Sequence, residues 1–301
     1  SQIADIECAT PNSIDPDPPG VYSYSSDPIV YQNGEPLVLN IFYWQVKGPN
    51  GDYGNHEFTE EKVLESVALL NIQYNPYNIF FKYRGYDCFE TPANLPSKNY
   101  VWDNVLQEYV CETVSGAVDP DGYGIVDRCQ IQDFWVYSFL NGYKHNDAIN
   151  IYVPYGTIGF GGVAIDHGSN KTILPISKIN TLTAYHEIAH NFGIYHTRSA
   201  DEHTTRDPFL PNGDPNLEFN ALKAGDMLVE STANSGYLFF DANGQPYYPY
   251  IDANCNYQPG FETDETGEPY EIFPEDIINN MTDAYECITN SFFPSQIIRM
   301  R

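Results

Sequence analysis

The segment from His186 to His196 constrains this chain more than any other part of the sequence. It reads HEIAHNFGIYH, with two histidines four residues apart and a third beyond a glycine. On a helix, this spacing places His186 and His190 on one face, one turn apart, where both rings can reach the same metal ion. Gly193 accepts the positive φ that ends a helix sharply, and the resulting turn brings His196 round as a third ligand. The pattern predicts a helix that ends at a metal site.

Three imidazole ligands are typical of a catalytic zinc site, because the fourth tetrahedral position stays open to water. Glu187 follows the first histidine, and we expect it to act on that water as a general base rather than to bind the metal. The alternative is a surface helix with polar residues. Against it stand the apolar residues between the polar ones, since buried histidines and a buried glutamate need a partner. These residues are Ile188, Ala189, Phe192 and Ile194.

With two later segments, this motif resembles the metzincins, and among them the pappalysin branch. Residues 278–283 (INNMTD) resemble the methionine-containing turn of that family, and residues 292–300 (FFPSQIIRM) resemble its closing helix. The resemblance runs from about residue 35 to the C-terminus. It implies a secreted, zinc-dependent endopeptidase that hydrolyses protein or peptide substrates.

The same resemblance implies an α/β fold with two lobes. Residues 31–193 would form an N-terminal lobe with a twisted mixed sheet, a backing helix and the zinc-binding helix. Residues 194–301 would form a C-terminal lobe that is mostly irregular and closes with a helix starting at Pro294. Residues 1–30 are rich in Pro, Ser and Asp, so we expect an extended arm similar to a pro-segment.

Local patterns predict a β-α-β unit near the start of the N-terminal lobe. Residues 37–46 and 79–83 read as buried strands, because they are β-branched and aromatic. Between them, Thr59 is a candidate N-cap of a helix that runs to about Tyr74, so the strands should be parallel. Further strands are expected at 148–153 and 161–165, and the zinc helix at 179–192, capped by Asn180 or Thr181. The apolar segment at 134–140 fits either a helix or a strand. Residues 87–130 are expected to be loop-like, and residues 197–275 to be irregular.

Substrate contacts follow from the resemblance alone. Gly161, Gly162 and Val163 would belong to a strand that borders the cleft and pairs with an extended peptide. Glu286 directly precedes Cys287 and would favour Arg or Lys after the scissile bond. The alternative for Glu286 is a solvated surface glutamate, because the chain has 41 acidic residues.

The methionine-containing turn matches the family pattern at one position and departs from it at another. Met281 would pack beneath the histidines without binding the metal. Two residues later, where the family usually has a tyrosine that stabilises the transition state, this chain has Asp283. Tyr285 is therefore the remaining tyrosine for that role. Arg198, two residues after the third histidine, also replaces the residue that is usual in the family.

Two groups of acidic residues offer the oxygen ligands that calcium prefers. Asp119, Asp121 and Asp127 are spaced as in part of a calcium loop, although an ordinary Asp-Gly turn is the alternative. Asp226 and Glu230 lie in a segment that resembles a calcium-binding segment of the family. We expect structural calcium in addition to one catalytic zinc ion.

Six cysteines favour disulfides and an extracellular location. The pair that we expect is Cys255 with Cys287, because both flank the methionine-containing turn in a loop-rich region. Two of the three cysteines Cys88, Cys111 and Cys129 are expected to bond with each other. Pairing cannot be deduced from spacing alone.

Cys8 has two interpretations. Its surroundings resemble a segment of pappalysin pro-regions, which implies a thiolate in the fourth zinc position of a latent form. The alternative is a disulfide, with Cys129 as the candidate partner. In the first case the arm would be inhibitory.

Charge and hydropathy exclude several classes of function. The chain has 14 basic and 41 acidic residues, a net charge of −27, so nucleic acid is a poor partner. Its acidic surface would keep it soluble and steer basic peptides towards it. No run of eighteen apolar residues occurs, so we expect no membrane insertion, and any secretion signal would already be removed. The oligomeric state is not defined by the sequence.

Two other functions compete with peptide hydrolysis. The chain could be a binding module with a structural zinc ion, but such a module has no use for Glu187. It could also be a zinc hydrolase that acts on bonds other than peptide bonds. A protease assay with and without a chelator separates these functions.

Overall fold

The computed structural model describes most of residues 34–198 and shorter parts of residues 199–301. The described residues are 34–51, 58–106, 108–156, 161–164, 167–198, 212–213, 225–228, 231, 239–241, 246–258, 269, 272–284, 287–289 and 291–301. The predicted arm at residues 1–30 lies outside them. Within these ranges, no helix is both long and apolar enough to cross a membrane.

A five-stranded sheet in the order β2-β1-β5-β7-β6 is the largest sheet of the described residues. Strand β1 pairs in parallel with β2 and β5, β5 pairs in parallel with β7, and the edge strand β6 runs antiparallel to β7. The strands are β1 (Leu37–Lys47), β2 (Ile79–Glu90), β5 (Ile149–Pro154), β6 (Val163–Ala164) and β7 (Lys171–Ile173). The mixed sheet and its helices confirm the predicted α/β class.

The predicted β-α-β unit is present at the start of this sheet. Helix α2 (Glu60–Tyr74) begins after Thr59, whose side-chain oxygen accepts a hydrogen bond from the Lys62 amide. A short 3-10 turn, η1 (Asn75–Tyr77), then leads into β2. Because α2 crosses over the sheet, β1 and β2 are parallel, as expected for such a connection.

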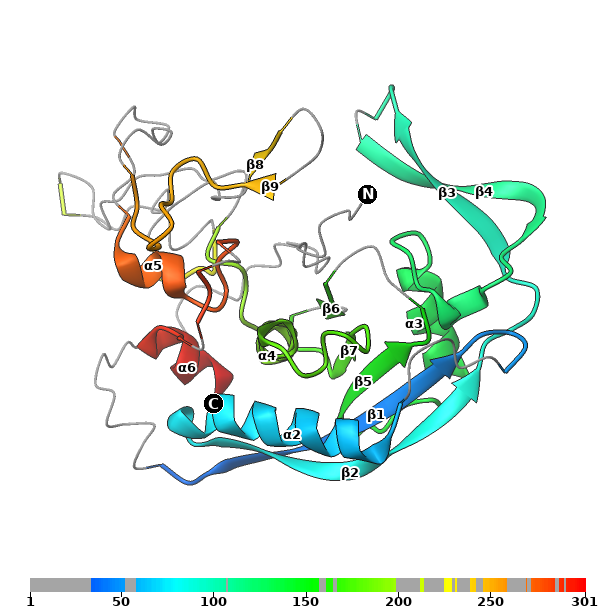
Figure 1. Cartoon of the computed structure of the whole chain (residues 1–301), viewed down its shortest axis with the longest axis horizontal. Helices are drawn as coiled ribbons and strands as arrows, with labels where there is room; N and C mark the ends of the chain where they lie inside the picture. Colours follow the sequence, from blue (N-terminus) through cyan, green and yellow to red (C-terminus); the bar gives the residue numbers. More distant parts are fainter. Residues whose placement is uncertain are drawn as a thin grey trace.

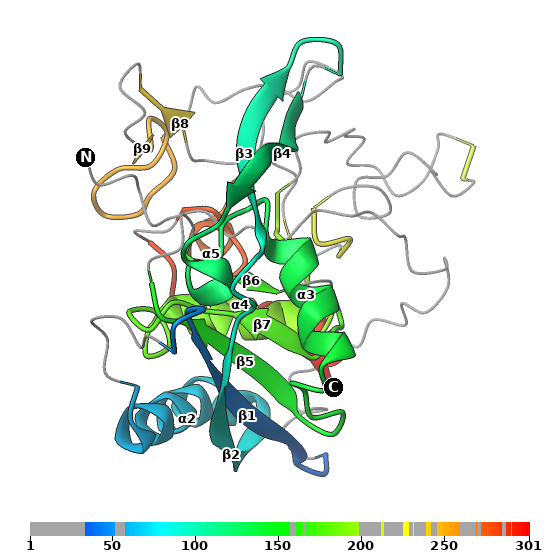
Figure 2. The ribbon, with the colours of Figure 1, turned by 90° about the vertical axis from the view of Figure 1, so that its right-hand side faces the viewer.

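Helices cover both faces of the sheet, so the core has two layers. Alternate residues of β1 point to opposite faces: Ile41 and Tyr43 belong to the cluster under α2 and α4 (Leu182–Asn191), whereas Phe42 and Trp44 belong to the cluster under α3 (Ile131–Leu140). Figures 1 and 2 show these helices around the sheet. The apolar segment that fitted helix or strand is therefore part of α3.

The prediction of a loop at residues 87–130 is wrong. Strand β2 continues to Glu90, and β3 (Pro96–Asp103) forms an antiparallel hairpin with β4 (Glu108–Val118) that projects from the body of the molecule (Figure 1). Exposed residues such as Tyr100 and Trp102 show that the hairpin buries little of its own surface. Its strands therefore lack the apolar alternation that marks a strand in the sequence. A 3-10 turn, η2 (Gly122–Gly124), follows.

The described parts of residues 199–301 have little regular structure, as expected for residues 197–275. They contain a two-stranded pair, β8 (Phe239–Phe240) with β9 (Pro246–Tyr247), then α5 (Pro274–Ile278) and α6 (Pro294–Met300). Helix α6 begins at Pro294, as predicted. Its Ile297 and Met300 pack into the core cluster under α2, so the chain end is part of the main core.

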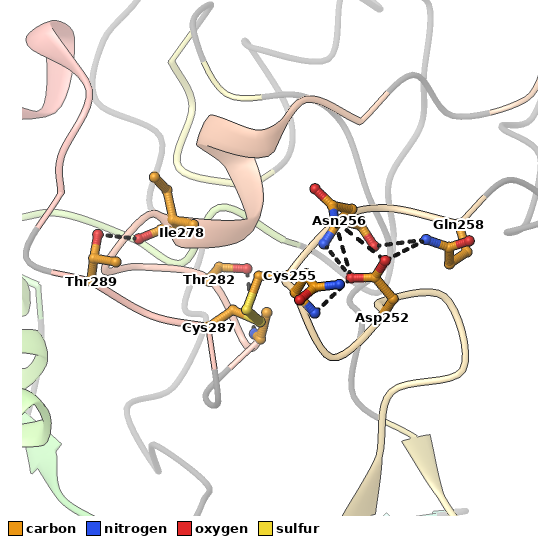
Figure 3. Close-up of a disulfide and its surroundings, with 10 residues drawn as sticks. Asp252, Cys255, Asn256, Gln258, Ile278, Thr282, Cys287 and Thr289 are labelled. Carbon is orange, nitrogen blue, oxygen red and sulfur yellow. Dashed lines mark hydrogen bonds between the residues drawn. A yellow bond between two sulfur atoms is a disulfide. The ribbon is translucent and has the colours of Figure 1, made fainter.

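Polar side chains and a disulfide stabilise the loops in this part of the chain. Figure 3 shows Cys255 bonded to Cys287, beside a loop that is arranged around Asp252. The Asp252 carboxylate accepts hydrogen bonds from the Asn254 and Asn256 amides at 2.8 and 2.9 Å and from Gln258 Nε2 at 3.1 Å. The bonds from the Asn256 and Asn254 amides lower the pKa of Asp252.

Candidate metal centre

Helix α4 carries the metal motif and begins at Leu182. The sequence predicted a start at Ile179, but Ile179 precedes the helix, and its carbonyl accepts a hydrogen bond from Ser66 Oγ at 2.5 Å. Of the two candidate caps, Thr181 is the one used, because its Oγ1 accepts from the Thr183 amide at 3.2 Å. The zinc helix therefore starts after the Thr181 cap and not at Ile179.

Helix α4 lies in the interior of the protein, since every residue from Ala184 to Asn191 is buried. Beyond the helix the chain turns at Gly193, whose φ is +81°. A Cβ at this position would meet no atom within 4 Å, so glycine is required for its backbone conformation and not for space. The predicted role of Gly193 as the helix terminator is consistent with this geometry.

The turn brings the histidines together. The ligand nitrogens of His186, His190 and His196 lie within 4.8 Å of one another, and the Nε2 atoms of His186 and His196 are 3.2 Å apart. All three residues are buried. Among the residues that the structure describes, they are the only group of three His, Cys, Asp or Glu side chains close enough to hold a metal ion.

Two backbone carbonyls orient the rings. His186 Nδ1 lies 2.6 Å from the carbonyl oxygen of Asn280, and His190 Nδ1 lies 2.6 Å from that of Ile194. A carbonyl only accepts hydrogen bonds, so each Nδ1 carries the proton and each Nε2 presents its lone pair to the shared space. This donor set fits zinc, which is commonly bound by neutral imidazole nitrogens.

Burial also keeps the histidines neutral. It lowers the pKa of His186 to about 4 and moves the pKa of His190 and His196 well below their ordinary value. The positive charge of Arg198 adds to this effect at His186 and His196. At neutral pH the rings are therefore in the protonation state that a metal ligand needs.

Glu187 is fully buried and lies against the edge strand of the sheet. Its Oε2 accepts a hydrogen bond from the Ala164 amide at 3.0 Å. At Gly162, an added Cβ would lie 2.7 Å from Glu187 Cγ and 2.8 Å from a Leu174 methyl carbon. Gly162 therefore makes room for this carboxylate, and the predicted cleft strand, with Gly161 and Val163 on either side of Gly162, borders the candidate base.

The segment with Met281 contacts the metal-binding motif from the C-terminal part of the chain. Met281 is fully buried in the core cluster, and its carbonyl accepts a hydrogen bond from the Thr197 amide at 3.0 Å. Asn280, next to it, supplies the carbonyl that holds His186. Asp283 forms an ion pair with Arg198, with 3.0 Å between Oδ2 and Nε.

Several of these contacts have no signal in the sequence. The carbonyls of Asn280 and Ile194 and the amide of Ala164 are backbone groups, and any residue type provides them. By contrast, Arg198 and Asp283 stand out in the sequence as departures from the family pattern, although their pairing does not. Tyr285 and Glu286 lie outside the described residues.

The structure does not bring Asp119, Asp121 and Asp127 together as a metal site, since the histidines are the only such group in the described ranges. Asp119 accepts hydrogen bonds from the Asp121 amide and from Gln130 Nε2. Asp121 accepts one from Tyr155, and Asp127 accepts one from the Gln130 amide. These carboxylates accept hydrogen bonds around the turn, and a calcium ion here stays a prediction.

Asp226 is also satisfied by protein groups. It is fully buried, and it accepts hydrogen bonds from the Leu228 amide, Ser231 Oγ and Gln296 Nε2 at 3.1, 2.5 and 2.7 Å. Burial raises its pKa to about 6. Glu230, its predicted partner in calcium binding, lies outside the described residues, so a calcium ion here stays a prediction.

Two disulfides are present among the residues that the structure describes. Cys255 bonds to Cys287, which confirms the predicted pair, and Cys111 bonds to Cys129, which confirms that two of the three clustered cysteines pair. Because Cys129 is used in this way, the alternative bond from Cys8 to Cys129 is wrong. Cys88 is a free thiol. Cys8 lies outside the described residues, and its role as a zinc ligand stays a prediction.

Comparisons with known proteins find similarity only at the level of structure. No family model matches the sequence, and no curated protein sequence matches it. A promirolysin mutant from Tannerella forsythia is similar over 89% of this chain and 80% of its own, with a TM-score of 0.45 and 15% identity. Metalloproteinase-II from Bacteroides fragilis is similar over 57% of this chain and 47% of its own, with a TM-score of 0.31 and 14% identity.

A chaperone–substrate complex also contains a similar chain, over 62% of this chain and 29% of that one, with a TM-score of 0.33 and 15% identity. All these likenesses are distant, so none of them decides an activity. The fold and the site themselves define the class: an α/β protein with a buried centre of three histidines.

Proposed function

We propose that this protein is a zinc metalloprotease that cleaves internal peptide bonds of protein or peptide substrates. One observation carries the proposal: three neutral, buried imidazoles converge beside Glu187, a buried carboxylate that is not one of them. A structural zinc site usually has four protein ligands, whereas three ligands and an adjacent base are typical of hydrolysis. The metalloproteinases among the similar structures agree with it.

In the proposed reaction, zinc and the residues of the chain have different roles. Zinc, when bound, supplies a water of lowered pKa and polarises a carbonyl group. Glu187 takes a proton from the attacking water and passes it to the leaving amine as the peptide C–N bond breaks. The Ala164 amide, which donates to Glu187, holds the carboxylate towards the edge strand.

The substrate would lie along β6. This strand is at the edge of the sheet, and it contacts Glu187 through Ala164. An extended peptide that adds to such an edge gains main-chain hydrogen bonds, with little demand on its side chains. The acidic charge of the chain would favour basic peptides, and Glu286 would favour Arg or Lys after the scissile bond.

Other features belong to the same proposal. They are the pappalysin assignment, secretion, a structural calcium ion at Asp226 and Glu230, stabilisation of the transition state by Tyr285, and latency through Cys8. Two disulfides agree with an extracellular location.

The test compares Glu187→Gln with the wild type in a casein assay, with zinc content measured on the same samples. The variant should bind as much zinc as the wild type and lose activity by a factor of about 10²–10⁴, because the general base is gone. Glu61→Gln, on the exposed surface of α2, is the matched control and should keep full activity. Cleavage by Glu187→Gln at the wild-type rate would refute the assignment of the base.

A second assay separates the competing functions. Activity that disappears with a chelator and returns with zinc supports a metalloprotease. Wild-type protein that binds zinc but cleaves no peptide, even after removal of residues 1–30, would favour a binding module or a hydrolase of other bonds. Activity that appears only after this removal would support latency.

A further inference from the structure

The chain after the third histidine lies along the turn that contains Met281. The Thr197 amide donates to the Met281 carbonyl at 3.0 Å. One residue further on, Arg198 Nε lies 3.0 Å from Asp283 Oδ2. The same turn holds His186 through the Asn280 carbonyl, so it positions a metal ligand and Arg198 together.

The two members of this ion pair differ in exposure. The Asp283 side chain is 3% exposed, whereas the Arg198 side chain is 29% exposed. A carboxylate that is buried to this extent needs a compensating cation. The ion pair with Asp283 therefore holds Arg198 in place. A guanidinium carries N–H donors on three nitrogens, and one that meets a carboxylate at Nε has donors left for a ligand.

The charge of Arg198 lies close to the metal ligands. Arg198 follows the third histidine by two residues, and the turn that carries its partner Asp283 also carries the Asn280 carbonyl that contacts His186. A fixed cation beside a buried site attracts negative charge more strongly than a cation in water, because the surroundings screen it less. The ion pair with Asp283 therefore holds a cation on the same turn that positions a metal ligand.

We propose that Arg198 is a catalytic residue that donates hydrogen bonds to the scissile carbonyl oxygen as this oxygen becomes negative. Asp283 is the positioning residue that holds Arg198 there. The inference rests on the proposed peptidase function. It also accounts for the acidic residue in the turn, since Asp283 acts through Arg198 and not on the substrate.

The role of Arg198 in the reaction is electrostatic. The water oxygen bonds to the carbonyl carbon, and the π electrons of the carbonyl move to its oxygen. When the C–N bond breaks, these electrons re-form the carbonyl, and the amine takes the proton held by Glu187. Arg198 transfers no proton and acts only through its charge and its N–H donors.

The alternative is that the ion pair only fastens the chain to the turn. Both roles predict that its loss affects stability. They differ in the response of kcat, and in the binding of an anionic, tetrahedral ligand compared with that of a neutral one.

The first experiment measures kcat, KM and zinc content for Arg198→Ala, Arg198→Lys and Asp283→Asn. For Arg198→Ala we expect full zinc content, a kcat lowered by roughly 10²-fold and a nearly unchanged KM, because one oxyanion donor is removed. Arg198→Lys should retain part of the activity, and added guanidinium should partly rescue Arg198→Ala. Arg84→Ala, which removes a surface ion pair with Asp147, is the matched control and should behave as the wild type.

The second experiment needs no hydrolysis. Titration calorimetry on zinc-loaded protein compares a phosphinic peptide, which is anionic and tetrahedral, with the matching ketomethylene peptide, which is neutral. Arg198→Ala should weaken binding of the phosphinic peptide by roughly 10²-fold and leave the ketomethylene peptide almost unaffected.

The outcomes separate this inference from the proposed function. Equal kcat and equal phosphinate affinity in Arg198→Ala and the wild type would overturn the role of Arg198 and leave the protease intact. A wild type that does not cleave peptides, but binds phosphinate in an Arg198-dependent way, would overturn the protease and keep the anion site. If Arg198→Ala fails to bind zinc, the nearly isosteric Arg198→Gln and Arg198→Lys are measured in its place, with the same criteria.

Discussion

The two sides of the metal centre are held by different forces. On the sheet side, α4 lies in an apolar cluster with residues of β1, β5 and α2. On the side of the Met281 turn, buried polar residues bond to one another, for example Asn279 to Gln296 and Gln296 to Asp226. His186 joins the two, because its backbone belongs to α4 and its Nδ1 contacts the Asn280 carbonyl.

This difference shows how burial and orientation are divided in the site. Apolar contacts are non-directional, so they bury α4 but do not define the rotation of a ring. Hydrogen bonds are directional, so the turn defines which nitrogen of His186 faces the metal. A polar network of this kind is sensitive to the loss of one member, since the partners that remain are left buried and unsatisfied.

The largest expected effect comes from a cavity in the apolar cluster under α3, on the face of the sheet opposite α4. Trp135 of α3 is 2% exposed and packs against Tyr152 of β5. Trp135→Ala should lower the free energy of unfolding by about 3–5 kcal/mol, through lost burial and an unfilled cavity. Urea denaturation measures this, with the exposed Trp102→Ala as control. A loss below about 1 kcal/mol would show that the cluster under α3 is not held by apolar burial.

Removal of the disulfide beside the Met281 turn is expected to have the next largest effect. Cys255 and Cys287 are separated by 32 residues. The double variant Cys255→Ser/Cys287→Ser should be less stable by about 3 kcal/mol, because the unfolded chain is no longer constrained. Hydrogen exchange should increase around the turn and stay unchanged in β1 and β5. Equal increases in both regions would show that the two sides unfold as one unit.

Acid should destabilise the metal-free protein through the buried histidines. The pKa of His186 is about 4 when folded, compared with an ordinary value of 6.5. The folded state therefore binds fewer protons between these values, and its stability is complete above pH 6.5 and falls as the pH is lowered towards 4. We expect a loss on the order of 3 kcal/mol from this group. Thermal unfolding from pH 7.5 to 4.5 measures it, and His186→Gln should flatten the dependence.

A smaller effect is expected from Gln296, the centre of the polar network. Its side chain bonds to Asp226, Asn279 and the Phe293 amide. Gln296→Ala should lower stability by about 2 kcal/mol, because these groups stay buried without their partner. The control is Gln258→Ala, which removes an exposed side chain that bonds to Asp252. If both variants lose the same stability, the network does not orient the turn.

The smallest effect is expected at the start of α4. Thr181→Ala removes the side-chain cap of the zinc helix and should cost about 1 kcal/mol. Thr181→Ser keeps the hydroxyl and serves as the control. Because the packing of α4 is unchanged, zinc affinity should stay close to that of the wild type. A large loss of zinc would show that the cap, and not the core, holds the helix.

The sequence by itself determined the features that depend on neighbouring residues. The spacing of His186 and His190 places both on one helix face, and Gly193 supports the sharp turn, with a φ of +81°. Thr59 and Pro294 mark helix starts for local reasons, and both helices begin where they were predicted. These signals are reliable because caps, turns and helical spacing are properties of short segments.

Only the tertiary structure decided how distant segments complete the site. The hairpin of β3 and β4 buries little surface, so its strands carry no apolar pattern. The carbonyl of Asn280 orients His186, and Asp283 meets Arg198, although each pair is far apart in the sequence. Backbone groups have no residue signature, and a charged side chain does not reveal its partner. These contacts exist because the folded core brings α4 and the Met281 turn within hydrogen-bonding distance.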